Sequence, residues 1–177
     1  MMRSEPETEG DGTPLTDSTT DGKREMLRHT LATLAYRGGK SVRGAPEGFG
    51  SFSACEGARR PLEILSHVGD LLYWALWMAR GEYRWPEETT RAWDEEVARF
   101  FDGLRALEEF LATEEPLGNT PEKIFQGPIA DALTHVGQIA MLRRMAGAPV
   151  RGENYFLAEI VAGRVGDEQA APRKEFD

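Results

Sequence analysis

Residues 61–80 read PLEILSHVGDLLYWALWMAR, and this stretch decides the fold. Pro61 is favourable in the first turn of a helix, and Glu63 suits the positive end of the helix dipole. Apolar residues recur through the segment at helical spacing, and Gly81 follows as a stop signal. We predict a helix over 61–80, and its apolar side chains make it the most buried helix of the chain: Ile64, Leu65, Leu71, Leu72, Trp74, Leu76 and Met78.

Three other segments carry one apolar stripe each at helical spacing. The first is predicted over 23–37, with Leu27, Leu31 and Leu34 on one face and Gly38-Gly39 as its end. The next is predicted to open at Pro86 with Glu87 and Glu88, and charged residues occupy its other face. Its apolar stripe is Trp93, Val97, Phe100, Leu104, Leu107 and Leu111.

The last long helix is predicted from Pro128 to about Ala146, with Gly147 as its cap. A short helix should precede it from Thr120 and Pro121, and Gly127-Pro128 should break that helix. We find no alternation of apolar and polar residues that would indicate a sheet. Four long helices with one apolar stripe each predict an all-α four-helix bundle.

The remaining segments are polar. Residues 1–22 are rich in acid, Thr and Gly, so we expect a disordered tail, and we expect a weakly ordered polar tail over 166–177. The folded domain then spans 23–165. Residues 38–60 hold six glycines and are predicted to form a long loop of the kind that is usually functional or mobile.

Composition excludes several classes of protein. The chain has 177 residues and a formal net charge of -9, which argues against general affinity for nucleic acid. No apolar run approaches the ~20 residues of a membrane span, and the N-terminus lacks the apolar core of a secretory signal. The single cysteine, Cys55, excludes an internal disulfide. We therefore expect a soluble cytoplasmic protein that binds neither nucleic acid nor membrane.

The stretch IADALTHVGQIAML, residues 129–142, places polar side chains at the edge of an apolar face. Asp131, His135, Gln138 and Leu142 lie within about 60° of one another on a helix. The same arithmetic places His67 of the 61–80 helix on its predicted core face. Burial of an uncompensated acid is costly. Either a divalent metal compensates it, or these groups form a hydrogen-bonded polar seam between helices.

A metal site is chemically reasonable because one divalent ion accepts neutral imidazole and carboxylate together. Two ligands four residues apart point the same way, and a third from a facing helix would complete the site. The candidate ligands are His67, Asp131 and His135. His29 lies off the apolar face of its helix and is predicted to be a surface residue. The sequence has no His-Glu-x-x-His motif, no repeated Glu-x-x-His pair, no P-loop and no G-x-S-x-G elbow.

The segments PLEILSHVGDLLYWAL and GPIADALTHVGQIAMLRRMAGAPV resemble the DinB/YfiT-like superfamily of metal-dependent enzymes. The resemblance covers roughly residues 25–150, and it matches His67, Asp131 and His135, with HVGQ at 135–138, to the family's ligands. Most members carry His where this chain has Asp131, and related thiol-dependent isomerases carry Glu.

The resemblance implies a bundle with up-down-down-up connections, one divalent ion, usually zinc or nickel, and often a homodimer. It also implies action on a small-molecule substrate, either as a transferase or isomerase that uses a low-molecular-weight thiol, or as a hydrolase. A non-catalytic binding or dimerisation module stays open, and so does a ligand sensor whose 38–60 loop closes on its ligand.

Other polar residues have two interpretations each. Gln138 either contacts a metal ligand or the substrate, or it only packs between helices. Asp70 either accepts a hydrogen bond from His67 or faces water. Arg37, Lys40 and Arg43 either hold a substrate carboxylate or belong to a solvated loop. Arg143 and Arg144 lie beyond the site and are expected to cap the helix C-terminus.

Overall fold

The second long helix, α2 (Pro61–Arg80), has the predicted bounds. The carboxylate of Glu63 accepts a hydrogen bond from the backbone N–H of Arg60 at 2.7 Å, which satisfies one of the free donors at the helix start. Gly81 ends the helix in the left-handed region, at φ 76°. The computed structural model describes residues 17–87, 89 and 91–176, so the first sixteen residues of the predicted tail lie outside it.

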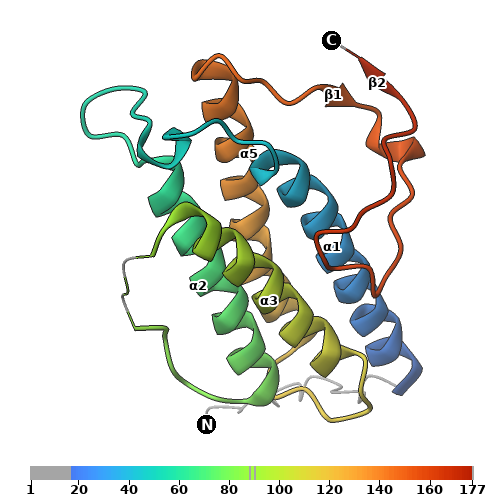
Figure 1. Cartoon of the computed structure of the whole chain (residues 1–177). Coiled ribbons are helices and arrows are strands. Elements are labelled where there is room, and N and C mark those ends of the chain that lie inside the picture. The colour runs from blue at the N-terminus through green and yellow to red at the C-terminus, as the bar shows by residue number, and fades with distance from the viewer. Residues whose placement is uncertain (1–16, 88, 90, 177) are drawn as a thin grey trace, which may run out of the picture.

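Helix α2 packs against α3 (Trp93–Leu111) and α5 (Ala130–Met145), and α1 (Asp17–Val42) packs against both of these from the other side (Figure 1). The four helices enclose one apolar core, so the predicted all-α class is confirmed. Helices α2 and α3 begin at the same end of the molecule, as the contacts of Ser66 with Glu96 and of Asp70 with Arg99 show. No described helix is long and apolar enough to cross a bilayer.

The prediction that Gly38-Gly39 ends the first helix is wrong. Helix α1 begins six residues earlier than predicted and continues through both glycines to Val42. A Cβ atom at Gly38 would lie 2.5 Å from Cζ of Phe100, so the missing side chain is what lets α3 approach α1. A helical glycine costs about 1 kcal/mol in propensity, and burial of the Phe100 ring offsets this cost.

The start of α3 also differs from the prediction at Pro86. The helix begins at Trp93, where the Glu95 carboxylate accepts a hydrogen bond from the N–H of Ala92 at 2.7 Å. This is the arrangement that also starts α2. Described residues between Gly81 and Trp93 are not helical, so Pro86 belongs to a connection rather than to a first helical turn.

The prediction that Gly127-Pro128 breaks the short helix is wrong. The short helix α4 (Pro121–Ile124) continues through a π-helical turn, η2 (Phe125–Ile129), directly into α5. A proline has no N–H and clashes with the carbonyl four residues earlier. The π-helical turn, in which hydrogen bonds join residues five apart, accommodates the proline. The chain therefore stays helical through Pro128 and on into α5.

The C-terminal residues are held against α1. The prediction of a weakly ordered tail over 166–177 is therefore wrong for residues 175–176, which form a strand. Strands β1 (Gly152–Glu153) and β2 (Glu175–Phe176) pair in antiparallel register, which the sequence pattern did not indicate. Lys40 donates to Glu153 at 2.8 Å and to Glu175 at 2.7 Å. Two 3-10 turns, η1 (Phe49–Ser51) and η3 (Tyr155–Leu157), complete the elements.

The Glu153 side chain is fully buried, and the Tyr36 hydroxyl donates to it at 2.7 Å. Burial and this carboxylate raise the pKa of Tyr36 well above its usual value. The ammonium of Lys40 lowers the pKa of the more exposed Glu175, chiefly through their hydrogen bond. The last strand is therefore attached to α1 mainly by charge.

We expect Phe100→Ala to lower the free energy of unfolding by about 3–5 kcal/mol, because the ring is fully buried between α1 and α3. Urea denaturation followed by circular dichroism measures this. Phe156→Ala is the control, since Phe156 is 93% exposed and its loss should change stability by less than about 0.5 kcal/mol. A cost below about 1 kcal/mol for Phe100→Ala would contradict the described packing.

The attachment of β2 should depend on pH. The pKa of Glu175 is lowered in the folded protein, so its ion pair contributes stability above the ordinary glutamate pKa of about 4.3 and loses it as the pH falls through the lowered value. We expect Glu175→Gln to melt below the wild type at pH 7, and the difference in Tm to shrink as the pH falls below about 4.3 and to vanish only below the lowered pKa of Glu175. A difference that stays constant from pH 7 to pH 3 would contradict this account.

Candidate metal centre

The three predicted ligands lie on two adjacent helices at the edge of the core. His67 comes from the middle of α2, and Asp131 and His135 come from the first turns of α5. Their side chains are 27%, 45% and 12% exposed, respectively. His67 therefore borders the core instead of lying within it, and Asp131 is open to solvent.

The structure brings these three side chains together. One donor atom from each lies within 4.8 Å of the other two. Nε2 of His67 is 3.5 Å from Oδ2 of Asp131, and the two imidazole rings have centroids 4.9 Å apart. A tetrahedral ion with bonds of ~2.1 Å holds its ligand atoms about 3.4 Å apart. The spacing between His67 and Asp131 fits such an ion.

The hydrogen bonds of His135 fix which of its nitrogens could bind a metal. Nδ1 lies 2.9 Å from the backbone carbonyl oxygen of Asp131. A carbonyl oxygen only accepts, so Nδ1 carries the proton and Nε2 keeps its free electron pair. Metal-binding histidines are commonly oriented in this way, by donation from the other nitrogen to a carbonyl group. Nδ1 also lies 3.1 Å from Oδ1 of Asp131, so this side of the ring faces that carboxylate. The residue types of the donor set fit a divalent ion.

Two tryptophans border the site. Trp74 of α2 contacts Trp85 of the 82–92 connection, with ring centroids 5.4 Å apart, and the Trp85 ring lies 6.2 Å from that of His67. Trp85 is 49% exposed. This side of the site is thus apolar and reachable from solvent, and its indoles lie close enough to report on an ion bound at His67.

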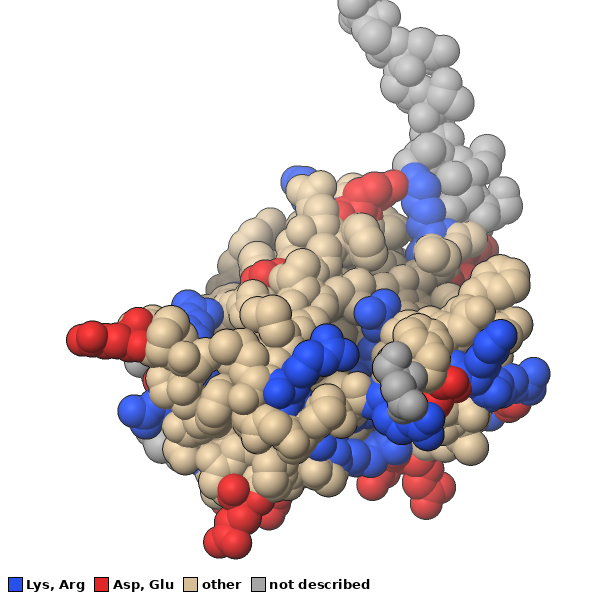
Figure 2. Space-filling view, turned by 90° about the horizontal axis from the view of Figure 1, so that it is seen from above, with Lys and Arg blue, Asp and Glu red and all other residues tan. Residues whose placement is uncertain are grey.

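The other side of His67 opens into a pocket of about 1010 Å³. The start of α2, the start of α3 and the loop before α2 surround it. Residues that line it include Gly57, Arg59, Arg60, Glu63, Ser66, Asp70, Arg91 and Glu96. Seen from the end of the bundle that carries this loop, Lys and Arg are spread across the face while Asp and Glu lie mainly at its rim (Figure 2).

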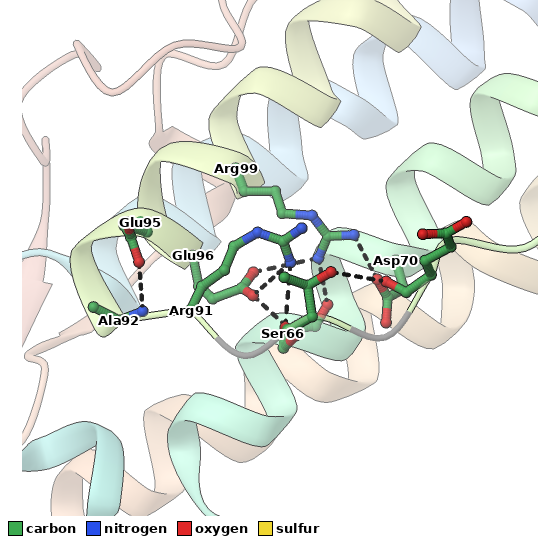
Figure 3. A network of polar contacts seen from close by, with 9 residues as sticks. Ser66, Asp70, Arg91, Ala92, Glu95, Glu96 and Arg99 are labelled. Atoms are coloured by element: carbon green, nitrogen blue, oxygen red, sulfur yellow. Dashed lines mark hydrogen bonds and ion pairs between the residues drawn. The ribbon is translucent and has the colours of Figure 1, made fainter.

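A buried ionic network connects α2 and α3 behind the pocket. Glu96 is completely buried and accepts hydrogen bonds from Ser66 at 3.0 Å and from Arg91 at 3.2 Å. Arg99 donates to Glu96 and to the Ser66 carbonyl oxygen, and it pairs with Asp70 (Figure 3). Both arginines converge on one carboxylate, so this acid is the centre of the α2–α3 contact.

Sequence reasoning missed this network, because Glu96 lies in an acidic first turn that we assigned to the solvated face. The only signal was its position three residues before Arg99. Asp70, one turn from His67, neither bonds to that histidine nor simply faces water, since Arg99 binds it. Gln138 is exposed, so its interpretation as a helix-packing residue is wrong.

The cations predicted near the 38–60 loop have other contacts. Lys40 lies within α1 and binds two glutamates, and the Arg37 guanidinium stacks on Tyr155 at 4.5 Å. These contacts do not support the suggestion that both hold a substrate. His29 is exposed, as predicted, and Cys55 is exposed too.

Comparison of the chain with protein-family models, with curated proteins and with solved structures finds no match. The candidate site is therefore judged on its own geometry.

We expect Glu96→Ala to destabilise the protein by about 3–5 kcal/mol, since it leaves two arginines without their buried carboxylate. Chemical denaturation measures the loss. Glu109→Ala, which removes an exposed acid from the same helix, should cost less than about 0.5 kcal/mol. Equal costs for the two variants would show that the network does not hold α2 to α3.

Proposed function

We propose that the chain binds one divalent metal ion through His67, Asp131 and His135, and that it is a metal-dependent enzyme acting on a small molecule. The observation that carries this proposal is the convergence of the three donor atoms within 4.8 Å at a solvent-accessible edge of the core. The proton on Nδ1 of His135 supports it further, because this tautomer leaves Nε2 available. Zinc and nickel suit this nitrogen and oxygen donor set.

We also propose the up-down-down-up connectivity of the DinB/YfiT-like superfamily for the bundle. The common starting end of α2 and α3 supports this arrangement, since two consecutive helices of that fold run in the same direction. With it we propose the reaction classes that the resemblance implies: transfer or isomerisation with a low-molecular-weight thiol, or hydrolysis.

Three protein ligands leave coordination positions for substrate, which is typical of catalytic and not structural sites. A bound divalent ion would supply Lewis-acid activation of a substrate oxygen or sulfur atom. The chain's own residues would do the rest. Asp131, as the most exposed ligand, lies where solvent and substrate arrive, and Trp85 covers the adjacent side of His67.

We expect stoichiometric zinc or nickel in protein purified without a histidine tag, measured by elemental analysis. A chelator should lower the Tm and added metal should restore it, because an ion that binds only the folded state stabilises it by about 2.7 kcal/mol at a hundredfold excess over Kd. His67→Ala and His135→Ala should each abolish stoichiometric binding and leave helical content unchanged. Quenching of tryptophan fluorescence by nickel gives a second readout of the same site.

Substitutions of Asp131 test whether its carboxylate is a metal ligand. Asp131→Ala should weaken metal binding strongly, whereas Asp131→His should retain it, because imidazole is also a good ligand at this spacing. His29→Ala is the matched control and should bind metal like the wild type. If His67→Ala and His29→Ala bind metal equally well, the three residues form only a polar seam between helices. Metal-loaded protein should then be screened against thiol adducts and esters for activity.

A further inference from the structure

The pocket beside His67 contains two arginines whose charge the fold does not use. Arg59 and Arg60 line the pocket at the start of α2, and both are exposed. Within the part of the chain that the structure describes, neither forms an ion pair with an acid. Their position in a concave wall, rather than on a convex surface, makes them available to a ligand that enters the pocket.

Two of the three acids that line the same pocket are already paired with arginines. Glu96 is bound by Arg91 and Arg99, and Asp70 is bound by Arg99. Glu63 accepts the backbone hydrogen bond that starts α2. Three arginines and three acids line the pocket, and of these acids Glu96 is paired with Arg91 and Asp70 with Arg99 from outside the lining. Within the described residues, Arg59 and Arg60 therefore face one unpaired carboxylate, that of Glu63, although the whole chain carries a charge of -9.

This contrast selects the class of ligand. Nucleic acid is disfavoured by the net charge of -9. A small molecule with one carboxylate or phosphate group meets only the pocket. Guanidinium groups bind such oxyanions through paired hydrogen bonds, and a volume of about 1010 Å³ is ample for a metabolite-sized molecule.

The position of the arginines relative to His67 sets the size of that molecule. Arg60 precedes His67 by seven residues, which is about 10 Å along the axis of α2 and about 20° around it. Arg60, Glu63 and His67 all line the pocket. A ligand that reaches from Arg60 to His67 therefore spans a distance on the order of 10 Å.

We infer that the pocket binds a small organic anion, with its carboxylate or phosphate group at Arg59 and Arg60 and its reacting end at His67. The second half of this inference rests on the proposed metal function, whereas anion binding by the arginines does not. Glu63 then acts against anions bound at the wrong place along the helix, because a second negative group near it would be repelled.

Isothermal titration calorimetry at constant ionic strength tests the inference, with butyrate and inorganic phosphate as probes and chloride as the balancing ion. The double variant Arg59→Gln/Arg60→Gln should bind the preferred probe at least about tenfold more weakly than the wild type. Arg80→Gln is the matched control, because Arg80 is an exposed arginine at the opposite end of α2, about 30 Å away. Glu63→Gln should tighten binding severalfold, since it removes the nearest free negative charge.

The two probes distinguish the sources of the oxyanion. Tighter binding of butyrate assigns a carboxylate ligand, and tighter binding of phosphate assigns a phosphorylated one. Equal affinity of the double variant and the wild type would overturn the inference, as would loss of affinity in Arg80→Gln of the same size. Absence of measurable binding of both probes to the wild type would overturn it too.

Metal-free protein prepared with a chelator separates this inference from the proposed function. It should still bind the probe within about threefold of the untreated protein, because the arginines are unchanged. If the chelated protein binds the anion and the untreated protein holds no metal, the anion site stands and the metal proposal fails. If metal binds as expected and the arginine variants bind the probes like the wild type, the metal proposal stands and the anion site fails.

Discussion

The guanidinium group of Arg143 fixes the relation between the last helix and the first, and the geometry of the candidate site follows from it. This side chain is almost completely buried, and it has no carboxylate partner among the residues that the structure describes. It donates instead to four backbone carbonyl oxygens, those of Ser41, Arg43, Gly44 and Ala148. Burial lowers the pKa of Arg143, and the partial negative charge at the end of α1 compensates the cation.

Two independent contacts therefore set the position of the histidines. Arg143 holds α5 against the end of α1 eight residues beyond His135, about 12 Å along the helix. The buried carboxylate of Glu96 holds α2 against α3 one residue before His67, through Ser66. The candidate ligands lie between these fixed points, on helices that have little freedom to separate. A metal site of this kind needs donor atoms with little freedom to move. Both contacts that restrain these helices involve a buried charged side chain, Arg143 in one and Glu96 in the other.

The sequence predicted those features that local rules control. The bounds of α2 follow from Pro61, Glu63 and Gly81, and the proximity of His67 to His135 follows from helical spacing and from packing of two apolar faces; the metal itself stays a prediction. The errors share one cause, which is that a partner distant in the chain changes the meaning of a residue. Gly38 is a contact surface for Phe100, and Glu96 is buried because two arginines reach it. No local pattern shows either partner.

The π-helical turn at 125–129 has a consequence for how such helices are compared between proteins. In an α-helix, residues five apart point about 140° away from each other, yet Ile124 and Ile129 are both completely buried. The wider turn behaves like one extra residue inserted into a regular helix, and it returns both side chains to the core. An alignment that crosses this turn without a gap would be correct on one side and one residue out of phase on the other. Asp131 and His135 lie just after that discontinuity, so their counterparts in another chain should be sought by counting back from the C-terminal end of the helix.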